Sequence, residues 1–312
     1  MMKPSASLVR GLSAQAAPLA SRKQKNLVLV DGVRTPFQMS STTYKELMPH
    51  DLQREALVSL LRRTGIDPKV VEYIVAGTVI QEVKTSNITR EAALGAGFSD
   101  RIPAHTVTMA CISSNQAITT CLGLMSQGVY DVCIAGGVET MSDVPIRHAR
   151  KMRQWMLASQ KMKSPLAMLG HIAKLRPAYL TPELPAIAEF STNETMGHSA
   201  DRLAATFAVS RTEQDEFAMR SHSMAKAAQE AGNLSDVAPI MVNKKVGIVD
   251  KDNGIRPSTP QQMAKLKAAF VKPHGTVTAA NASYLTDGAS ACLIMTEDKA
   301  KALGLQPKAY FR

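Results

Sequence analysis

Cysteine is scarce in this chain of 312 residues, and its spacing excludes several kinds of site. The four cysteines form no CxxC pair, and no histidine lies at metal-ligand spacing from them; they are Cys111, Cys121, Cys133 and Cys292. We therefore expect no metal site and no disulfide framework, which favours a reducing compartment. Long apolar runs are also missing, so the sequence predicts no helix that spans a membrane.

Acidic residues are absent from two stretches. Residues 1–30 contain five basic residues and no acid, and residues 147–176 contain eight basic residues and no acid. These two stretches more than account for the formal net charge of +11, so the rest of the chain is slightly acidic. The first composition predicts an organellar transit peptide over residues 1–25, with a basic disordered tail as the alternative.

Aromatic residues are few, and Trp155 is the only tryptophan. It lies in the basic stretch 147–176, where Met152, Trp155 and Met156 follow helical i, i+3, i+4 spacing. The predicted helix has one apolar and one cationic face, which is typical of helices that lie in a membrane interface. Packing on a partner subunit or lining an acyl tunnel fits the pattern equally well. Nucleic-acid binding is not expected, because Trp155 is the only side chain there that suits base stacking.

The remaining composition is that of a globular protein. Hydrophobic residues make up 45% of the chain, and the length suits about two domains. β-rich runs at 26–31, 70–78, 104–109 and 129–136 alternate with helical patterns at 51–65, 87–95 and 113–127. This alternation predicts βαβ units and a mainly parallel sheet.

The pattern changes after residue 145. Ser210 and Glu213 form a capping box for a helix over 211–231, and residues 237–270 suggest a loop or hairpin region. The run 290–296 is predicted to be a strand that returns to the first sheet. We therefore expect an α/β fold with a five-stranded, mixed and mostly parallel sheet. Helices should cover both of its faces, and residues 145–271 should form an inserted, mainly helical loop domain.

Cys111 is the candidate for chemistry. A predicted strand ends just before Cys111, and the helix that follows begins near Ser113, so Cys111 faces the free N–H groups and positive dipole of a helix N-terminus. Such a position favours a nucleophilic thiolate, although free cysteines are also common as small buried residues. Cys121 and Cys133 are expected in the core, and His198 and His222 are expected to be packed or surface residues.

Five motifs in this order resemble those of the thiolases. They are VTMACISSNQA (107–117), AGGVETMSDVP (135–145), ETMGHSADRLA (194–204), SRTEQDEFAMRSH (210–222) and GTVTAANASYLTDGASA (275–291). The resemblance extends over essentially all of residues 26–312 and implies the thiolase fold. Within the family, the chain is most similar to membrane-associated 3-ketoacyl-CoA thiolase subunits of mitochondrial fatty-acid β-oxidation.

The resemblance implies a thiolytic cleavage in which a 3-ketoacyl-CoA and CoA give acetyl-CoA and an acyl-CoA shortened by two carbons. It implies that Cys111 carries the acyl group as a thioester, a role suited to sulfur. By the same motif match, Met196 would line the acyl pocket and Ser283 would contact the pantetheine arm of CoA. CoA is therefore expected as co-substrate, with no bound cofactor. Thr195 stands where several thiolases have histidine, so no role is transferred to it.

The family also implies motifs that are missing here. Thiolases place an activating histidine, a second cysteine and an oxyanion-binding group in His-Glu-Ala-Phe, Gly-His-Pro and Cys-x-Gly motifs. The first two do not occur in the 312 residues, and the Cys-x-Gly triplet at 121–123 lies inside a predicted helix of the first domain. We expect an N-terminal thiolase domain at 26–144 plus 272–300, with 301–312 beginning a truncated second thiolase half. The chain alone should then be inactive in turning over substrate, and it should be poorly soluble. A catalytically incompetent binding or assembly module is the alternative.

The resemblance implies four partners: an α subunit with hydratase and dehydrogenase activities, a second β subunit, CoA substrates and the mitochondrial inner membrane on its matrix side. It also favours the membrane interpretation of the basic stretch. The residues expected to contact anionic lipid are Arg150, Lys151, Arg153, Trp155, Lys161 and Lys163.

Overall fold

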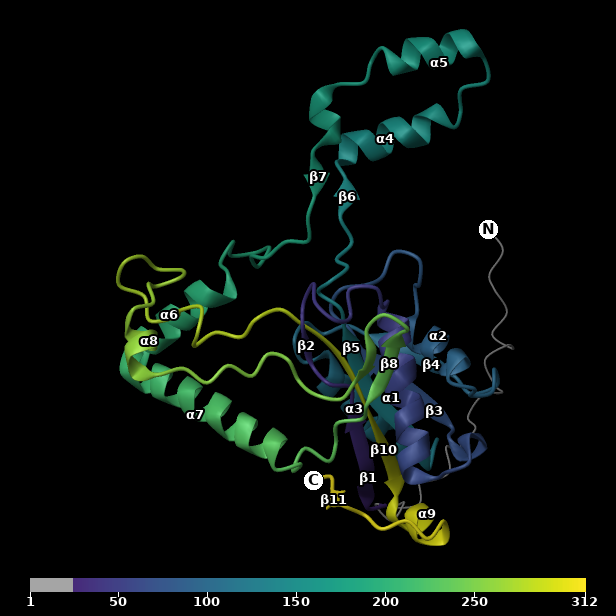
Figure 1. The fold of residues 1–312 in the computed structure, drawn as a ribbon. Helices are drawn as coiled ribbons and strands as arrows, with labels where there is room; N and C mark the ends of the chain where they lie inside the picture. Colours follow the sequence, from purple (N-terminus) through teal and green to yellow (C-terminus); the bar gives the residue numbers. More distant parts are fainter. Residues whose placement is uncertain (1–24) are drawn as a thin grey trace, which may run out of the picture.

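The computed structural model describes residues 25–312 and is built around one mixed β-sheet (Figure 1). The strand order is β11 (Ala309–Tyr310), β1 (Leu27–Arg34), β10 (Thr286–Thr296), β5 (Val132–Glu139), β3 (Tyr73–Gly77) and β4 (Ala104–Val107), and β2 (Gln38–Met39) pairs with one end of β10. The residues of the predicted transit peptide lie outside the described part, except Lys25.

The sheet is parallel on one side and antiparallel on the other. β3 pairs in parallel with β4 and β5, whereas β10 is antiparallel to both β1 and β5. The mixed α/β sheet is therefore confirmed, and β2 and β11 extend the five predicted strands at its margins. β5 begins at Val132 rather than 129, because the chain turns through Gly128 (φ 70°) after the preceding helix.

Helices cover both faces of the sheet, as the sequence predicts. α1 (Pro49–Thr64) and α2 (Ile88–Gly95) pack on one face, where the largest buried cluster includes Leu52, Ile134 and Leu293. α3 (Ser113–Ser126) packs on the other face, against β3 and β5. Cys121 and Cys133 are fully buried there, which confirms their assignment to the core. The short helices η1 (Pro68–Val70) and α9 (Glu297–Ala302) complete this part.

The basic stretch forms a helical hairpin that projects from the rest of the molecule (Figure 1). Its helices are α4 (Arg150–Ser159) and α5 (Pro165–Ile172), followed by the short helix η2 (Pro177–Leu180). The two-residue strands β6 (Arg147–His148) and β7 (Pro182–Glu183) pair at its base. Across residues 25–312, no helix has the length and apolar character needed to cross a bilayer.

The rest of the predicted insertion consists of α6 (Met196–Thr206), α7 (Arg211–Glu230), the hairpin β8 (Ile240–Asn243) and β9 (Gly247–Val249), and α8 (Pro260–Ala264). The capping box of Ser210 and Glu213 is present at the start of α7. Ile240 is buried in the main core, so the β8–β9 hairpin is attached to the sheet domain. Residues 301–312, predicted to begin another domain, add β11 to the edge of the first sheet.

Candidate active site

Cys111 lies in the turn between β4 and α3 and is exposed. Ala110 adopts a left-handed conformation (φ 46°), which is uncommon for a residue with a side chain and recurs at functional sites. Ile112, the residue after Cys111, is the N-cap of α3 and supplies no side-chain hydrogen bond, so no N-cap side chain occupies the first N–H groups of the helix. The position predicted for Cys111, before the first turn of a helix, is confirmed.

A single hydroxyl closes the turn that carries the thiol. Ser113 Oγ accepts a hydrogen bond from the N–H of Met109 at 2.9 Å and donates one to the carbonyl of Ala110 at 2.6 Å. A further backbone bond runs from Ile112 N–H to Met109 C=O at 3.3 Å. The left-handed residue beside Cys111 is therefore held on both sides.

Two glycines bring the first turn of α3 against the sheet. A Cβ on Gly77, at the end of β3, would overlap the backbone of Ser113 and Ser114. A Cβ on Gly137, in β5, would overlap the Oγ of Ser114. Only glycine leaves room for the helix end at Gly77 and Gly137.

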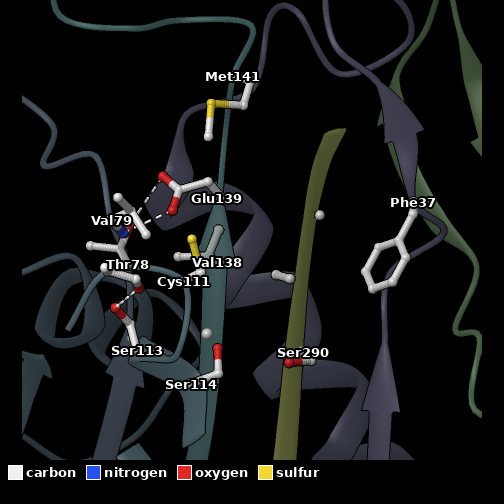
Figure 2. Close-up of a pocket in the computed structure, with 15 residues that line it drawn as sticks. Phe37, Thr78, Val79, Cys111, Ser113, Ser114, Val138, Glu139, Met141 and Ser290 are labelled. Carbon is white, nitrogen blue, oxygen red and sulfur yellow. Dashed lines mark hydrogen bonds between the residues drawn. The ribbon is translucent and has the colours of Figure 1, made fainter. Parts of the chain in front are cut away.

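Figure 2 shows the cavity next to the thiol. Its volume is about 330 Å³, and it lies where β5, β10 and the loop after β3 meet the N-terminus of α3. Apolar groups and backbone form most of its wall, and among the described residues Glu139 is the one acidic side chain that lines it. The lining residues include Phe37, Thr78, Val79, Cys111, Glu139 and Met141.

Glu139 is held by the loop that follows β3. Its carboxylate accepts hydrogen bonds from the N–H groups of Val79 (2.8 Å) and Ile80 (3.1 Å) and from the hydroxyl of Thr78 (3.4 Å). Burial raises the pKa of Glu139, and the three hydrogen bonds oppose part of that rise. The carboxylate joins the end of β5 to the end of β3 directly beside the cavity.

Phe37 forms another wall and is held by a partly buried ion pair. Both terminal nitrogens of the Arg34 guanidinium bond to the carboxylate of Asp252, at 2.8 and 3.0 Å. The same carboxylate accepts the N–H of Phe37 at 2.6 Å, and the guanidinium lies 4.5 Å from the ring centroid of Phe37. The inserted segment therefore fixes one side of the cavity.

Met196 and Ser283, the other expected substrate contacts, do not line this cavity. Met196 begins α6 with 68% of its surface exposed, and Ser283 is exposed in the segment before β10. His198 packs edge-on against Phe270, and Nδ1 of His222 accepts the N–H of Arg256, which confirms that both histidines are packed or surface residues. Among residues 25–312, no three His, Cys, Asp or Glu side chains gather to hold a metal.

The expected membrane-contact residues fall into two groups. Arg150, Lys151, Lys161 and Lys163 are exposed on the helical hairpin. Arg153 pairs with Glu183 at 2.8 Å, and Trp155 stacks on His171 with a centroid distance of 4.7 Å. Trp155 Nε1 also donates to the carbonyl of His171 at 3.0 Å. Arg153 and Trp155 therefore hold the hairpin together.

The sequence patterns indicate Cys111 but not Glu139, Phe37 or Gly77, which also line the cavity. Glu139 lies within the motif AGGVETMSDVP at the end of a buried strand, so a polar residue at a strand end was a usable signal. Phe37 and Gly77 had no such signal, because their roles depend on contacts with distant segments.

The site can be compared with those of known proteins. Residues 27–298 match the family described as Thiolase, N-terminal domain. The chain belongs to the thiolase family. A solved acetyl-CoA acetyltransferase from Bacillus anthracis superposes with a TM-score of 0.78 at 33% identity, covering 92% of this chain and 69% of that one. This confirms the thiolase fold expected from the motifs.

Two relatives extend the comparison. The chain is 67% identical over 294 residues to the mouse protein "Trifunctional enzyme subunit beta, mitochondrial". The matched region covers 94% of this chain and 62% of the mouse protein. It is 57% identical over 306 residues to "Probable 3-ketoacyl-CoA thiolase" of Caenorhabditis elegans, covering 97% of this chain and 68% of that protein. The chain thus spans less than two thirds of the length of its mouse relative.

Proposed function

We propose that this chain provides the nucleophile-bearing part of a mitochondrial 3-ketoacyl-CoA thiolase of fatty-acid β-oxidation. The observation that carries the proposal is the exposed thiol of Cys111 in a cavity at the N-terminus of α3. The names of the mouse and nematode relatives agree with this activity. CoA is the co-substrate, and no step requires a bound cofactor.

In this proposal the Cys111 thiolate attacks the 3-keto carbon, and the bond between C2 and C3 breaks. The electron pair of that bond leaves with the acetyl-CoA enolate, which takes up a proton. The acyl group stays on Sγ as a thioester until the thiol of CoA attacks it, forming a shortened acyl-CoA and restoring Cys111. Met196 and Ser283 remain the proposed contacts for the acyl chain and the pantetheine arm.

The acyl-transfer half of this sequence tests the proposal on the chain itself. Incubation with a long-chain acyl-CoA should release CoA and add the acyl mass to Cys111, as measured by intact and peptide mass spectrometry. Free CoA should then remove the adduct. The adduct should be absent in Cys111→Ser and present in the matched control Cys292→Ser. Equal acylation of wild type and Cys111→Ser would refute the role of Cys111.

We further propose that the helical hairpin attaches the protein to the matrix side of the mitochondrial inner membrane. Exposed apolar residues accompany its exposed cations, among them Leu157 (63%), Leu166 (81%) and Leu169 (64%). This combination suits a helix pair that lies in an anionic interface. Each Lys or Arg near such a surface contributes about 1 kcal/mol to binding, and the contributions of the four exposed cations of the hairpin add.

Flotation with cardiolipin-containing vesicles tests the attachment. The variant with Arg150, Lys151, Lys161 and Lys163 changed to Gln should lose most of its binding, since Arg153 is already paired with Glu183. The control changes four exposed lysines elsewhere, namely Lys244, Lys245, Lys265 and Lys267. Fluorescence of Trp155, the only tryptophan, reports on the hairpin during the titration. Binding that survives the hairpin changes would contradict the proposal.

Two protein partners belong to the same proposal: a second copy of the β chain and the α subunit of a trifunctional enzyme. β4 is the terminal strand of the described sheet, and Met109 and Ile112 beside it are half exposed, at 50% and 51%. An open strand edge flanked by apolar side chains suits pairing with another copy. Light scattering of wild type and Met109→Lys tests this: a dimer is expected for wild type only, and an unchanged mass refutes pairing through this edge. Co-purification with the α subunit tests the second partner.

A further inference from the structure

Glu139 connects the two strand ends that flank the candidate nucleophile. The residue ends β5, whereas its hydrogen-bond donors, Thr78, Val79 and Ile80, follow β3. Figure 2 shows Glu139, Thr78 and Val79 on the same side of the cavity as Cys111. The carboxylate therefore holds the loop after β3 in one position relative to the sheet.

That loop is in turn bonded to the segment that carries Cys111. The hydroxyl of Thr108 donates to the carbonyl of Thr78 at 2.8 Å, and Thr78 N–H donates to the carbonyl of Val107 at 3.1 Å. Gln81 Nε2 also donates to the Thr108 hydroxyl at 3.0 Å. Thr108 lies three residues before Cys111. A continuous set of hydrogen bonds thus runs from Glu139 through the loop to the turn that carries Cys111.

The arrangement disfavours Glu139 as a proton acceptor for the thiol. Both of its oxygens already accept hydrogen bonds, and two of the donors are backbone N–H groups. Taking a proton would weaken these bonds and release the loop. Fixed acceptors of this kind maintain geometry at an active site.

We propose that Glu139 is a positioning residue that, through Thr78 and Thr108, fixes the turn carrying Cys111. The proposal rests on the proposed role of Cys111 as nucleophile. It does not depend on turnover, because alkylation of the thiol reports its position directly.

The fold supplies a matched control at the opposite end of the same two strands. Glu72 precedes β3, and its carboxylate accepts the N–H groups of Asp131 (2.6 Å) and Val132 (3.0 Å) at the start of β5. Both glutamates therefore bridge β3 and β5 through backbone N–H groups, but only Glu139 lies beside the cavity. A purely structural role predicts the same result for both.

The experiment compares Glu139→Gln, Thr108→Val and Glu72→Gln in the full chain. The rate of iodoacetamide alkylation at Cys111 is followed by peptide mass spectrometry from pH 6 to 9.5, and urea midpoints confirm folding. For Glu139→Gln and Thr108→Val, we expect alkylation at pH 7.5 to slow at least about threefold. Glu72→Gln should keep the wild-type profile.

The proposal is overturned if Glu139→Gln and Glu72→Gln share one alkylation profile at equal urea midpoints. If Glu139→Gln fails to fold, Thr108→Val decides, and a wild-type profile for that variant also overturns it. The acyl-CoA test of Cys111 is separate. If the variants alter alkylation as expected but acyl-CoA does not acylate Cys111, the thiolase role is refuted and the positioning role stays intact.

Discussion

The Cα of Gly77 faces the backbone of Ser113 so closely that a methyl group between them would overlap the peptide. Gly77 ends β3, and Ser113 begins α3, which follows Cys111. The missing side chain therefore sets how near the helix N-terminus, and with it the thiol, lies to the sheet. A methyl group on Gly137 would likewise overlap Ser114, but there the overlap is with the side chain instead of the backbone.

Three glycine variants should form a graded series. Gly77→Ala should lower the free energy of unfolding by about 1–3 kcal/mol, because the backbone of α3 must shift. Gly137→Ala should cost less, since the Ser114 hydroxyl can rotate away. Gly123→Ala, in the exposed face of α3 with open space around it, should stabilise by about 0.5–1 kcal/mol. Urea unfolding measures all three, and equal effects would contradict the packing argument.

The two partners of Arg34 should differ in importance. Asp252 is largely buried and bonds twice to the guanidinium, whereas Asp236 is half exposed. Asp252→Asn should cost about 2–4 kcal/mol, because it leaves a poorly compensated cation and loosens Phe37. Asp236→Asn should cost below about 1 kcal/mol. Thermal or urea unfolding gives both values, and a larger loss for Asp236→Asn would contradict this ranking.

Cysteine alkylation should separate one reactive thiol from three protected ones. Burial raises the pKa of Cys292 to about 11, and a hydrogen bond with Cys133 together with burial raises the pKa of Cys121. At pH 8, iodoacetamide should modify Cys111 first, and Cys292 should follow only at strongly alkaline pH. Peptide mass spectrometry over a pH series measures each site. Modification of Cys292 as fast as Cys111 at pH 8 would contradict the structure.

Asp201 should make stability fall in acid. Burial raises its pKa, but hydrogen bonds from the N–H groups of Val277, Thr276 and Val271 outweigh burial, so the pKa is lower in the folded state than in the unfolded chain. Its contribution is therefore present above the unfolded pKa and lost as the pH falls through the folded value.

Urea midpoints between pH 6 and pH 2.5 test this contribution. The midpoint of Asp201→Asn should fall less with acidification than that of wild type. At pH 6 the free energy of unfolding of Asp201→Asn should already be lower than that of wild type by about 1.5–3 kcal/mol. Asp143→Asn, which changes an exposed carboxylate, serves as the control and should follow wild type. Parallel curves for wild type and Asp201→Asn would exclude the role of the hydrogen bonds.

Local patterns were sufficient to predict the alternation of strands and helices and the place of Cys111. The helix after Cys111 and the strand before it are each defined by residues close in sequence. The pairing of β10 between β1 and β5 was harder to predict, because paired residues such as Val33 and Ala291 are separated by more than half of the chain. Nothing local to either strand specifies that register.

The side-chain network of the site also depended on tertiary contacts. Whether Glu139 points to solvent or bonds to Val79 is decided by how β3 and β5 align. Trp155 illustrates the same limit: its spacing suggested a lipid-facing side chain, yet a histidine from the next helix packs against it. Helical spacing identifies the apolar face of a helix but not the partner of that face.

The short ladder at the base of the helical hairpin has a practical consequence. β6 and β7 place Arg147 beside Glu183, so the chain enters and leaves the hairpin at nearly the same point. Replacing residues 149–181 with a tight Asn-Gly turn would close that gap without stretching the backbone. The hairpin is therefore a detachable module, suited to transplantation onto another scaffold that offers a two-stranded opening.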